Sequence, residues 1–213
     1  MKGRLLIFEG GEGSGKSYMA KMAVEKLNVQ GIKTLWTREP GGSVFAEKIR
    51  KLILSDHAMH ADAETMFGLF WAARRDHIVH KIKPALEEGT HVLCERFDSS
   101  TWAYQIRGQQ QGQLRHLFLK MRKHYLAQIH PSAYILLNVD PKIGLQRVKK
   151  RTERKQTHFD KRNLEFHQRV NDGLIEFVTH ISDHIYIIID ANRPRRVVAT
   201  AVMDTLHRLL SLD

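Results

Sequence analysis

Residues 10–17 read Gly-Gly-Glu-Gly-Ser-Gly-Lys-Ser and satisfy the pattern GxxxxGKS. Glycines in such a loop let backbone N–H groups approach phosphate oxygens without obstruction by a Cβ atom. A lysine and a hydroxyl residue at the end of such a loop are typical of ATP sites. We expect Lys16 to bind the β- and γ-phosphates and the Ser17 hydroxyl to bind Mg²⁺. The expected ATP-binding set is Gly10, Gly11, Glu12, Gly13, Ser14, Gly15, Lys16 and Ser17.

This loop has the neighbours that a phosphate-binding loop needs. A short apolar run, Leu5-Leu6-Ile7-Phe8, precedes it, and apolar residues at helical spacing follow from Met19 to Leu27, before Gly31. The order predicts a strand, the loop and then a helix. The N-terminus of that helix would add its unpaired N–H donors and its dipole to the phosphate site.

The remainder of the chain alternates four further β-rich runs with helical patterns. The runs cover residues 34–37, 91–94, 134–139 and 185–189. Strands that alternate with helices predict a parallel sheet covered on both faces. We therefore expect one domain over residues 1–213 with the three-layer α/β/α fold of the P-loop NTPases, built on a five-stranded parallel sheet. Pro84, inside a helical pattern, predicts that this helix ends or kinks near Lys83.

The charge of the chain favours an anionic ligand. Its 34 Lys and Arg residues exceed its 23 Asp and Glu residues, which gives a formal net charge of +11. This excess fits a nucleic acid, an anionic lipid or a small polyanion such as a nucleotide. Residues 151–158 are polar and basic and have no apolar period, which predicts a mobile loop between two helices. This loop is the centre of the mobile basic lid that we expect over about residues 147–160.

Other classes of protein are excluded by the composition. The single cysteine, Cys94, allows neither an internal disulfide nor a zinc site built from cysteines, and it suits a reducing compartment. No apolar run approaches the roughly 20 residues that cross a bilayer, and the first run is too short for a signal peptide. We expect a cytoplasmic protein that does not bind membranes.

Several further runs resemble those of one enzyme family. They are TREPGG (residues 37–42), FWAAR (residues 70–74), and ERF (residues 95–97) followed by Ser100 and AYQ (residues 103–105). With the phosphate loop, they resemble bacterial thymidylate kinases in order and spacing over nearly the whole chain. TREPGG is the most specific run, because the phosphate loop alone occurs in many unrelated activities. The resemblance implies transfer of the γ-phosphoryl group of ATP to dTMP with Mg²⁺, and a homodimer.

The resemblance also implies an acceptor site. Phe70 and Arg74 share one helix face. The resemblance implies that Phe70 stacks on the thymine ring and that Arg74 contacts the edge of the base. Arg96 would hold the acceptor phosphate through paired N–H donors. The implied dTMP-binding set is Arg38, Glu39, Pro40, Phe70, Arg74, Arg96, Ser100, Thr101, Tyr104 and Gln105.

The implied chemistry needs positive charge and alignment rather than a general base. A phosphate monoester has its second pKa at about 6, so the acceptor oxygen is already anionic at neutral pH. Because Glu12 lies inside the phosphate loop, the resemblance implies that a lid arginine is catalytic, Arg151 or Arg154, with Arg147 as the next candidate. Glu9 and Glu95 would either orient Mg²⁺ or pair with basic groups. The implied catalytic set is Lys16, Arg96, Arg151, Arg154 and Glu9, and the implied metal set is Ser17 and Glu95.

Two alternatives remain open from the residues. A deoxyribonucleoside kinase phosphorylates a hydroxyl and would need a carboxylate base such as Glu9 or Glu95. An ATP-dependent nucleic-acid-binding protein would suit the +11 charge, although the chain carries no basic tail, and we expect no nucleic acid as partner. The chain also departs from the family pattern at Glu95, Trp102, Gln109, His158 and Leu174.

Overall fold

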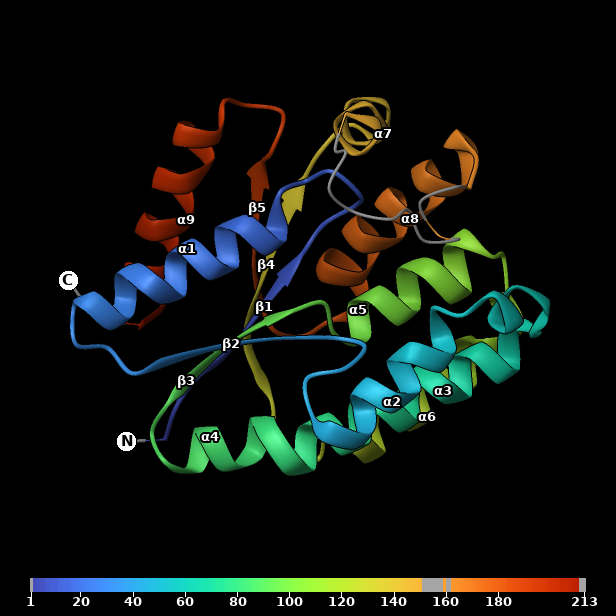
Figure 1. Ribbon diagram of the computed structural model, residues 1–213, viewed down its shortest axis with the longest axis horizontal. Helices are drawn as coiled ribbons and strands as arrows, with labels where there is room; N and C mark the ends of the chain where they lie inside the picture. Colours follow the sequence, from blue (N-terminus) through green and yellow to red (C-terminus); the bar gives the residue numbers. More distant parts are fainter. Residues whose placement is uncertain (1, 151–158, 160–161, 211–213) are drawn as a thin grey trace.

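A computed structural model describes residues 2–150, 159 and 162–210 of the chain. In this part of the chain, five parallel strands form one sheet in the order β2-β3-β1-β4-β5, which confirms the predicted fold class. Helices lie on both faces of the sheet (Figure 1). The strands are β1 (Leu5–Glu9), β2 (Thr34–Arg38), β3 (His91–Glu95), β4 (Pro131–Asn138) and β5 (Ile185–Asp190).

The helical segments connect these strands. The α-helices are α1 (Lys16–Val29), α2 (Val44–Ile53), α3 (Ala63–His77), α4 (Lys83–Glu87), α5 (Asp98–Thr101), α6 (Arg115–Tyr125), α7 (Pro141–Lys149), α8 (Leu164–Glu176) and α9 (Arg195–Leu210). Short 3₁₀ or π segments are η1 (Asp56–His60), η2 (Ile78–Ile82), η3 (Trp102–Gly108), η4 (Gly112–Leu114) and η5 (Phe177–Ile181). Among the described residues, no helix combines the length and the hydropathy that a bilayer span requires.

Alternating residues of the strands build two cores. On one face of the sheet, Leu6 and Phe8 of β1 pack in a cluster with Met19 of α1. On the other face, Ile7 of β1 belongs to a cluster that includes Trp71 of α3. Because both faces are covered, the central strands read as continuous apolar runs, and β1 is buried at every position.

The strand register brings the expected functional residues together. Glu95 at the end of β3 pairs with Phe8 of β1 on one side and with Arg38 of β2 on the other. Glu9 therefore lies at the same carboxyl edge, where parallel α/β sheets bind their ligands. The phosphate loop begins directly after Glu9 and ends at the first residues of α1.

The effect expected of Pro84 is only partly present. The helix does not end near Lys83, because α3, η2 and α4 follow one another without a break from Ala63 to Glu87. The irregularity is a π-helical turn, Ile78–Ile82, and Pro84 lies in the first turn of α4 after it. Inside a continuous helix a proline removes one N–H donor and its ring crowds the carbonyl of the preceding turn, and that preceding turn is the one with π-helical geometry.

Candidate active site

A cavity of about 380 Å³ lies at the carboxyl edge of the sheet, between the phosphate loop and α3. Residues predicted for both substrates line it together. From the ATP set these are Glu12, Gly13, Gly15, Lys16 and Ser17, and from the dTMP set Arg38, Glu39, Pro40, Phe70, Arg74, Arg96, Ser100, Tyr104 and Gln105. One cavity therefore has the residues expected on the donor side and those expected on the acceptor side.

The phosphate loop requires glycine at defined points. Gly13 has a φ of 74°, and a Cβ atom there would lie 2.1 Å from the carbonyl oxygen of Gly144 on α7. Lys16 is buried, and its Nζ lies 3.2 Å from the carbonyl oxygen of Gly11. Burial lowers the pKa of the Lys16 ammonium, and the nearby Arg96 lowers it further. An anionic phosphate at this point would favour the charged form of the lysine.

Gly10, Gly11 and Ser14 lie outside the cavity lining, although they belong to the same motif. A Cβ atom on Gly10 would lie 2.6 Å from the carbonyl oxygen of Leu137 on β4. The absence of a side chain at Gly10 thus allows the loop to pack closely against β4.

Ser17 and Glu95 bring two side-chain oxygen atoms together at the cavity wall. The Ser17 hydroxyl donates to Oε1 of Glu95 over 2.7 Å, and both residues line the cavity. Hydroxyl, carboxylate and phosphate oxygens are the ligands that Mg²⁺ prefers. The donor set therefore fits the metal expected at this position.

Glu9 lies outside the cavity lining and is fully buried. Its Oε1 accepts from the backbone N–H of Phe97 at 3.0 Å, from the Ser99 hydroxyl at 2.6 Å and from the Ser100 hydroxyl at 3.0 Å. Burial raises the pKa of the Glu9 carboxyl, while Arg96 and these hydrogen bonds oppose the rise. Of its two expected roles, the geometry favours pairing and positioning, because the carboxylate holds the segment that carries Arg96.

Arg96 joins the two sides of the cavity. Its Nη2 lies 2.7 Å from Oε1 of Glu12, and its Nη1 donates to the Ser100 hydroxyl over 3.2 Å. Its backbone is left-handed, with a φ of 66°, which is uncommon for a residue other than glycine and often marks a functional site. Burial alone would lower the pKa of this guanidinium, but Tyr104, Glu12 and Glu9 raise it above its usual range, so Arg96 is charged.

Tyr104 supports the same contact. Its ring lies 4.8 Å from the Arg96 guanidinium, and its hydroxyl donates to Oε1 of Glu12 over 2.9 Å. Burial raises the pKa of Tyr104 well above its ordinary value, so the phenol stays protonated and remains a donor.

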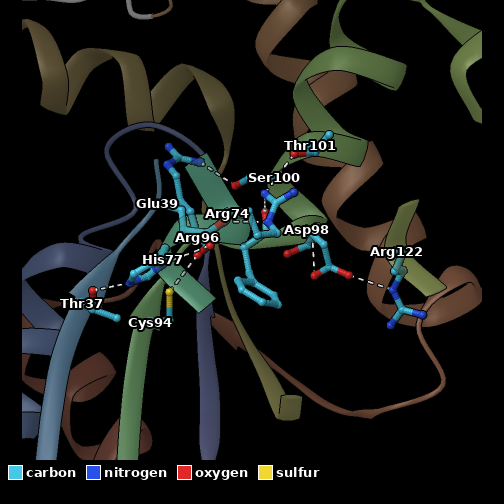
Figure 2. Close-up of polar contacts among 12 residues, drawn as sticks. Thr37, Glu39, Arg74, His77, Cys94, Arg96, Asp98, Ser100, Thr101 and Arg122 are labelled. Atoms are coloured by element: carbon cyan, nitrogen blue, oxygen red, sulfur yellow. Dashed lines mark hydrogen bonds and ion pairs between the residues drawn. The ribbon is translucent and has the colours of Figure 1, made fainter. Parts of the chain in front are cut away.

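Arg74 is held rigidly on the wall of the cavity (Figure 2). Its Nε donates to Oε2 of Glu39 over 2.8 Å, and its Nη2 donates to the carbonyl oxygen of Phe97 over 2.9 Å. Within the described residues, Nη1 of Arg74 and Nε2 of Gln105 have no hydrogen-bond partner, although both atoms are buried. Buried donors of this kind are rare, and both residues line the cavity, so a ligand is the expected partner.

Thr101 differs from its expectation. It is buried outside the cavity lining, and its hydroxyl accepts from Nη2 of Arg74 over 3.1 Å. Thr101 therefore contacts the arginine rather than the cavity, because its position on α5 turns the side chain toward α3 (Figure 2).

Arg151 and Arg154, the two lid arginines expected to be catalytic, lie outside the described residues, as does His158.

Two other residues singled out from the sequence lie away from the cavity. Arg147, at the start of the expected lid, lies on α7 and donates to the carbonyl oxygen of Ala191 over 2.8 Å. Trp102 is fully buried away from the cavity, and its indole donates to Glu176 over 3.0 Å.

The cavity also contains residues that sequence reasoning missed. Tyr18 and Lys21 of α1, Arg50 of α2, Leu54 after it and Phe159 all line it. The sequence holds a signal for Arg50, because it follows TREPGG on a helix whose opposite face is apolar. In the structure, its Nη1 donates to the Pro40 carbonyl over 2.7 Å. Phe159 had no such signal, since its contact with the Phe70 ring joins residues far apart in the chain.

Comparisons with known proteins agree with this geometry. The family described as thymidylate kinase matches residues 8–202. The chain is 39% identical over 211 residues to a thymidylate kinase of Geobacillus sp. (strain WCH70), covering 97% of this chain and 99% of the relative. It is 39% identical over 215 residues to a thymidylate kinase of Afipia carboxidovorans, covering 99% and 92%. A thymidylate kinase of Magnetococcus marinus is 38% identical over 204 residues, covering 95% and 94%.

Proposed function

We propose, from the premise that this chain belongs to the thymidylate kinase family, that it transfers the γ-phosphoryl group of ATP to dTMP and forms ADP and dTDP. One observation carries the proposal for this site. The phosphate loop and the acceptor-side residues line the same cavity, and the Arg96–Glu12 pair joins them.

On the donor side, the loop and Lys16 hold the ATP phosphates. The glycine backbone offers N–H donors, and the N-terminus of α1 adds its dipole. Lys16 is buried at the base of this site, so its charge acts at short range and in a low dielectric. The lysine neutralises charge that moves toward the β–γ bridge as the γ-phosphoryl group leaves.

On the acceptor side, the dTMP phosphate is already a nucleophile at neutral pH. Arg96 binds it and reduces the repulsion between two polyanions, and it is placed beside the donor loop by Glu12 and Ser100. Its held position favours in-line approach. Glu9 acts through its hydrogen bonds to the Phe97 N–H and the Ser99 and Ser100 hydroxyls, as a positioning residue.

The base site suits thymine. Its ring presents two carbonyl oxygens, which are acceptors. Arg74 and Gln105 line the cavity, and each carries a buried donor, Nη1 and Nε2, without a partner among the described residues. Phe70 lines the same cavity and gives a face on which a base can stack. A donor that is already desolvated discriminates strongly in favour of a ligand that accepts from it.

Ser17 and Glu95 would hold Mg²⁺ with the ATP phosphates. Bound there, the ion would neutralise phosphate charge and help to align the triphosphate. The Ser17 hydroxyl is oriented by Glu95 before the ion binds. Arg151 and Arg154, which lie outside the described residues, are proposed to add positive charge to the transferring group.

We also propose a cytoplasmic homodimer. Apolar side chains are exposed on α2 and η1, where Val44 is 85%, Phe45 58% and Met59 60% accessible. Leu117 and Leu119 of α6 are also exposed. Apolar surface of this kind favours association with a second copy. Light scattering during gel filtration distinguishes a dimer of 2 × 24.7 kDa from a monomer.

The test of the function is ADP release from Mg-ATP by the purified protein. The acceptors are dTMP, dUMP, dCMP, UMP, thymidine and DNA in parallel. We expect by far the highest kcat/KM with dTMP. Preference for thymidine would favour a deoxyribonucleoside kinase, and stimulation by DNA alone would favour an ATP-dependent nucleic-acid-binding protein; either outcome overturns the assigned acceptor site.

A further inference from the structure

His77 is buried directly behind the acceptor site. It lies on α3 three residues after Arg74, so the two side chains share a helix face. The Glu39 carboxylate contacts both: Oε1 lies 3.1 Å from Nδ1 of His77 and Oε2 lies 2.8 Å from Nε of Arg74. Figure 2 shows the three side chains in this order, with Thr37 on the far side of the histidine.

The partners of His77 assign its tautomer. A carboxylate paired with an arginine can only accept, so Nδ1 of His77 carries the proton in this contact. In the neutral ring, Nε2 is then an acceptor, and the Thr37 hydroxyl lies 2.7 Å from it and donates. Each polar atom of the imidazole therefore has one partner of the right kind.

The loop after β2 is folded closely around this ring. Gly42 has a φ of 91°, and a Cβ atom there would lie 2.3 Å from Nε2 of His77. Thr37, Glu39 and Gly42 all belong to TREPGG, so His77 contacts the beginning, the middle and the end of that run. The conformation of the run and the position of the histidine depend on each other.

We infer that His77 is a positioning residue for the acceptor base. It fixes the Glu39 carboxylate, and Glu39 fixes the guanidinium of Arg74, a residue of the cavity wall whose buried Nη1 has no hydrogen-bond partner among the described residues. His77 itself lies outside the cavity lining and acts only through Glu39. The inference rests on the proposed function, because it takes dTMP as the ligand that Arg74 contacts.

Three substitutions separate the two hydrogen bonds of the ring. His77→Leu removes both. His77→Asn keeps an N–H donor close to the position of Nδ1, whereas His77→Gln places its amide nearer to that of Nε2. We expect His77→Leu to raise the Kd for dTMP roughly tenfold, since a buried charge-assisted hydrogen bond is lost, while the Kd for ATP is unchanged. His77→Asn should restore dTMP binding to within about threefold, and His77→Gln should not.

A matched control is available on the same helical run. His80 lies in η2, is 66% exposed at its side chain and contacts Asp76 rather than Glu39. His80→Leu should leave both dissociation constants unchanged. An unchanged Kd for dTMP in His77→Leu would overturn the inference, as would an equal loss of ATP and dTMP affinity or a rescue by Gln rather than Asn.

A second readout does not require dTMP. The Nε–H proton of Arg74, assigned by its loss in Arg74→Lys, should exchange slowly with water in the wild type and in His77→Asn, and fast in His77→Leu. If the wild type binds no dTMP, the proposed function is wrong, and this exchange measurement still decides whether His77 holds Arg74. Equal exchange in all three proteins would show that it does not.

Discussion

Nη2 of Arg96 lies 2.7 Å from Oε1 of Glu12, so one ion pair joins the end of β3 to the phosphate loop. Tyr104 donates to the same carboxylate oxygen, and its ring lies against the Arg96 guanidinium. Contacts with the phosphate loop thus hold Arg96 in place. In the proposed reaction, whose catalysis is mainly alignment and charge, this ion pair would set the distance between the proposed donor and acceptor sites.

Replacement of Arg96 by lysine keeps the charge and removes the planar fork. We expect Arg96→Lys to lower kcat/KM for dTMP about 100-fold, because one ammonium cannot hold Glu12, Ser100 and a phosphate in the same geometry. Steady-state kinetics with dTMP varied at saturating ATP measures this. Arg196→Lys, at an exposed position of α9, is the control and should be neutral. A wild-type value for Arg96→Lys would show that charge alone suffices.

Truncation of Phe70 tests the base site. Phe70 is only half-buried, so Phe70→Ala should preserve the fold. The loss of base stacking should raise the KM for dTMP roughly tenfold and leave the KM for ATP unchanged. Both constants come from one two-substrate kinetic series. An unchanged KM for dTMP would show that Phe70 packs within the protein and does not bind the base.

The metal assignment predicts a change in the Mg²⁺ requirement. Glu95→Gln removes the charge next to Ser17 while keeping the size of the side chain. We expect the free Mg²⁺ concentration for half-maximal activity to rise about tenfold, as is usual when a ligand of a metal or its neighbour is weakened. The measurement is activity against free Mg²⁺ at constant ATP. Glu87→Gln, on exposed α4, is the control, and the same Mg²⁺ curve for both variants would exclude Glu95 from the metal site.

The sequence predicted the parts of this site that depend on local chemistry. The phosphate loop can be recognised from the sequence because its backbone needs a positive φ at two points close to Lys16, and glycine stands at both, Gly13 and Gly15. β1 and β4 are apolar runs because both of their faces are buried, whereas β5 is an apolar run although most of its residues are exposed. The ends of the predicted runs differ from those of the strands by only a few residues. These features are set by backbone conformation and by hydrophobic pattern.

The parts that were missed depend on contacts between distant segments. The Glu39–Arg74 pair spans 35 residues, and nothing around Thr101 indicates that its hydroxyl faces Arg74 instead of the cavity. The role of His77 has no local signal in the sequence, because its partners lie on β2 and in the loop after it. Packing of α3 against β2 decides these roles, and it is a tertiary property.

Removal of the ion pair between Arg122 and the buried Asp98, the first residue of α5, should destabilise the fold. Asp98 is fully buried, and its carboxylate accepts from Nε of Arg122 over 2.8 Å and from the Tyr134 hydroxyl over 2.6 Å. Arg122→Ala leaves this carboxylate without its charge partner, and we expect the free energy of unfolding to fall by about 3 kcal/mol. Urea denaturation measures it. The double variant Asp98→Asn, Arg122→Ala should lose less than the two single losses together, and strict additivity would contradict the pairing.

The stability of the fold should also fall in mild acid through His91. Its Nδ1 accepts from the backbone N–H of Arg4 over 3.0 Å, which only the neutral ring can do. Burial lowers the pKa of His91 below 6.5, and Arg4 lowers it further. Between the folded pKa and 6.5 the unfolded chain binds more protons, so the stabilisation is complete above 6.5 and is lost as the pH falls toward the folded pKa.

Other groups contribute to the same pH range, so a difference measurement is needed. Burial also lowers the pKa of His184, and burial raises the pKa of Glu9, which acts in the opposite direction. His91→Asn keeps an acceptor for the Arg4 N–H but does not titrate. The free energy of unfolding between about pH 7.5 and pH 5.5 should fall less steeply in this variant than in the wild type. His116→Asn, on exposed α6, should follow the wild-type curve, and parallel curves for wild type and His91→Asn would exclude His91 as a source of the acid sensitivity.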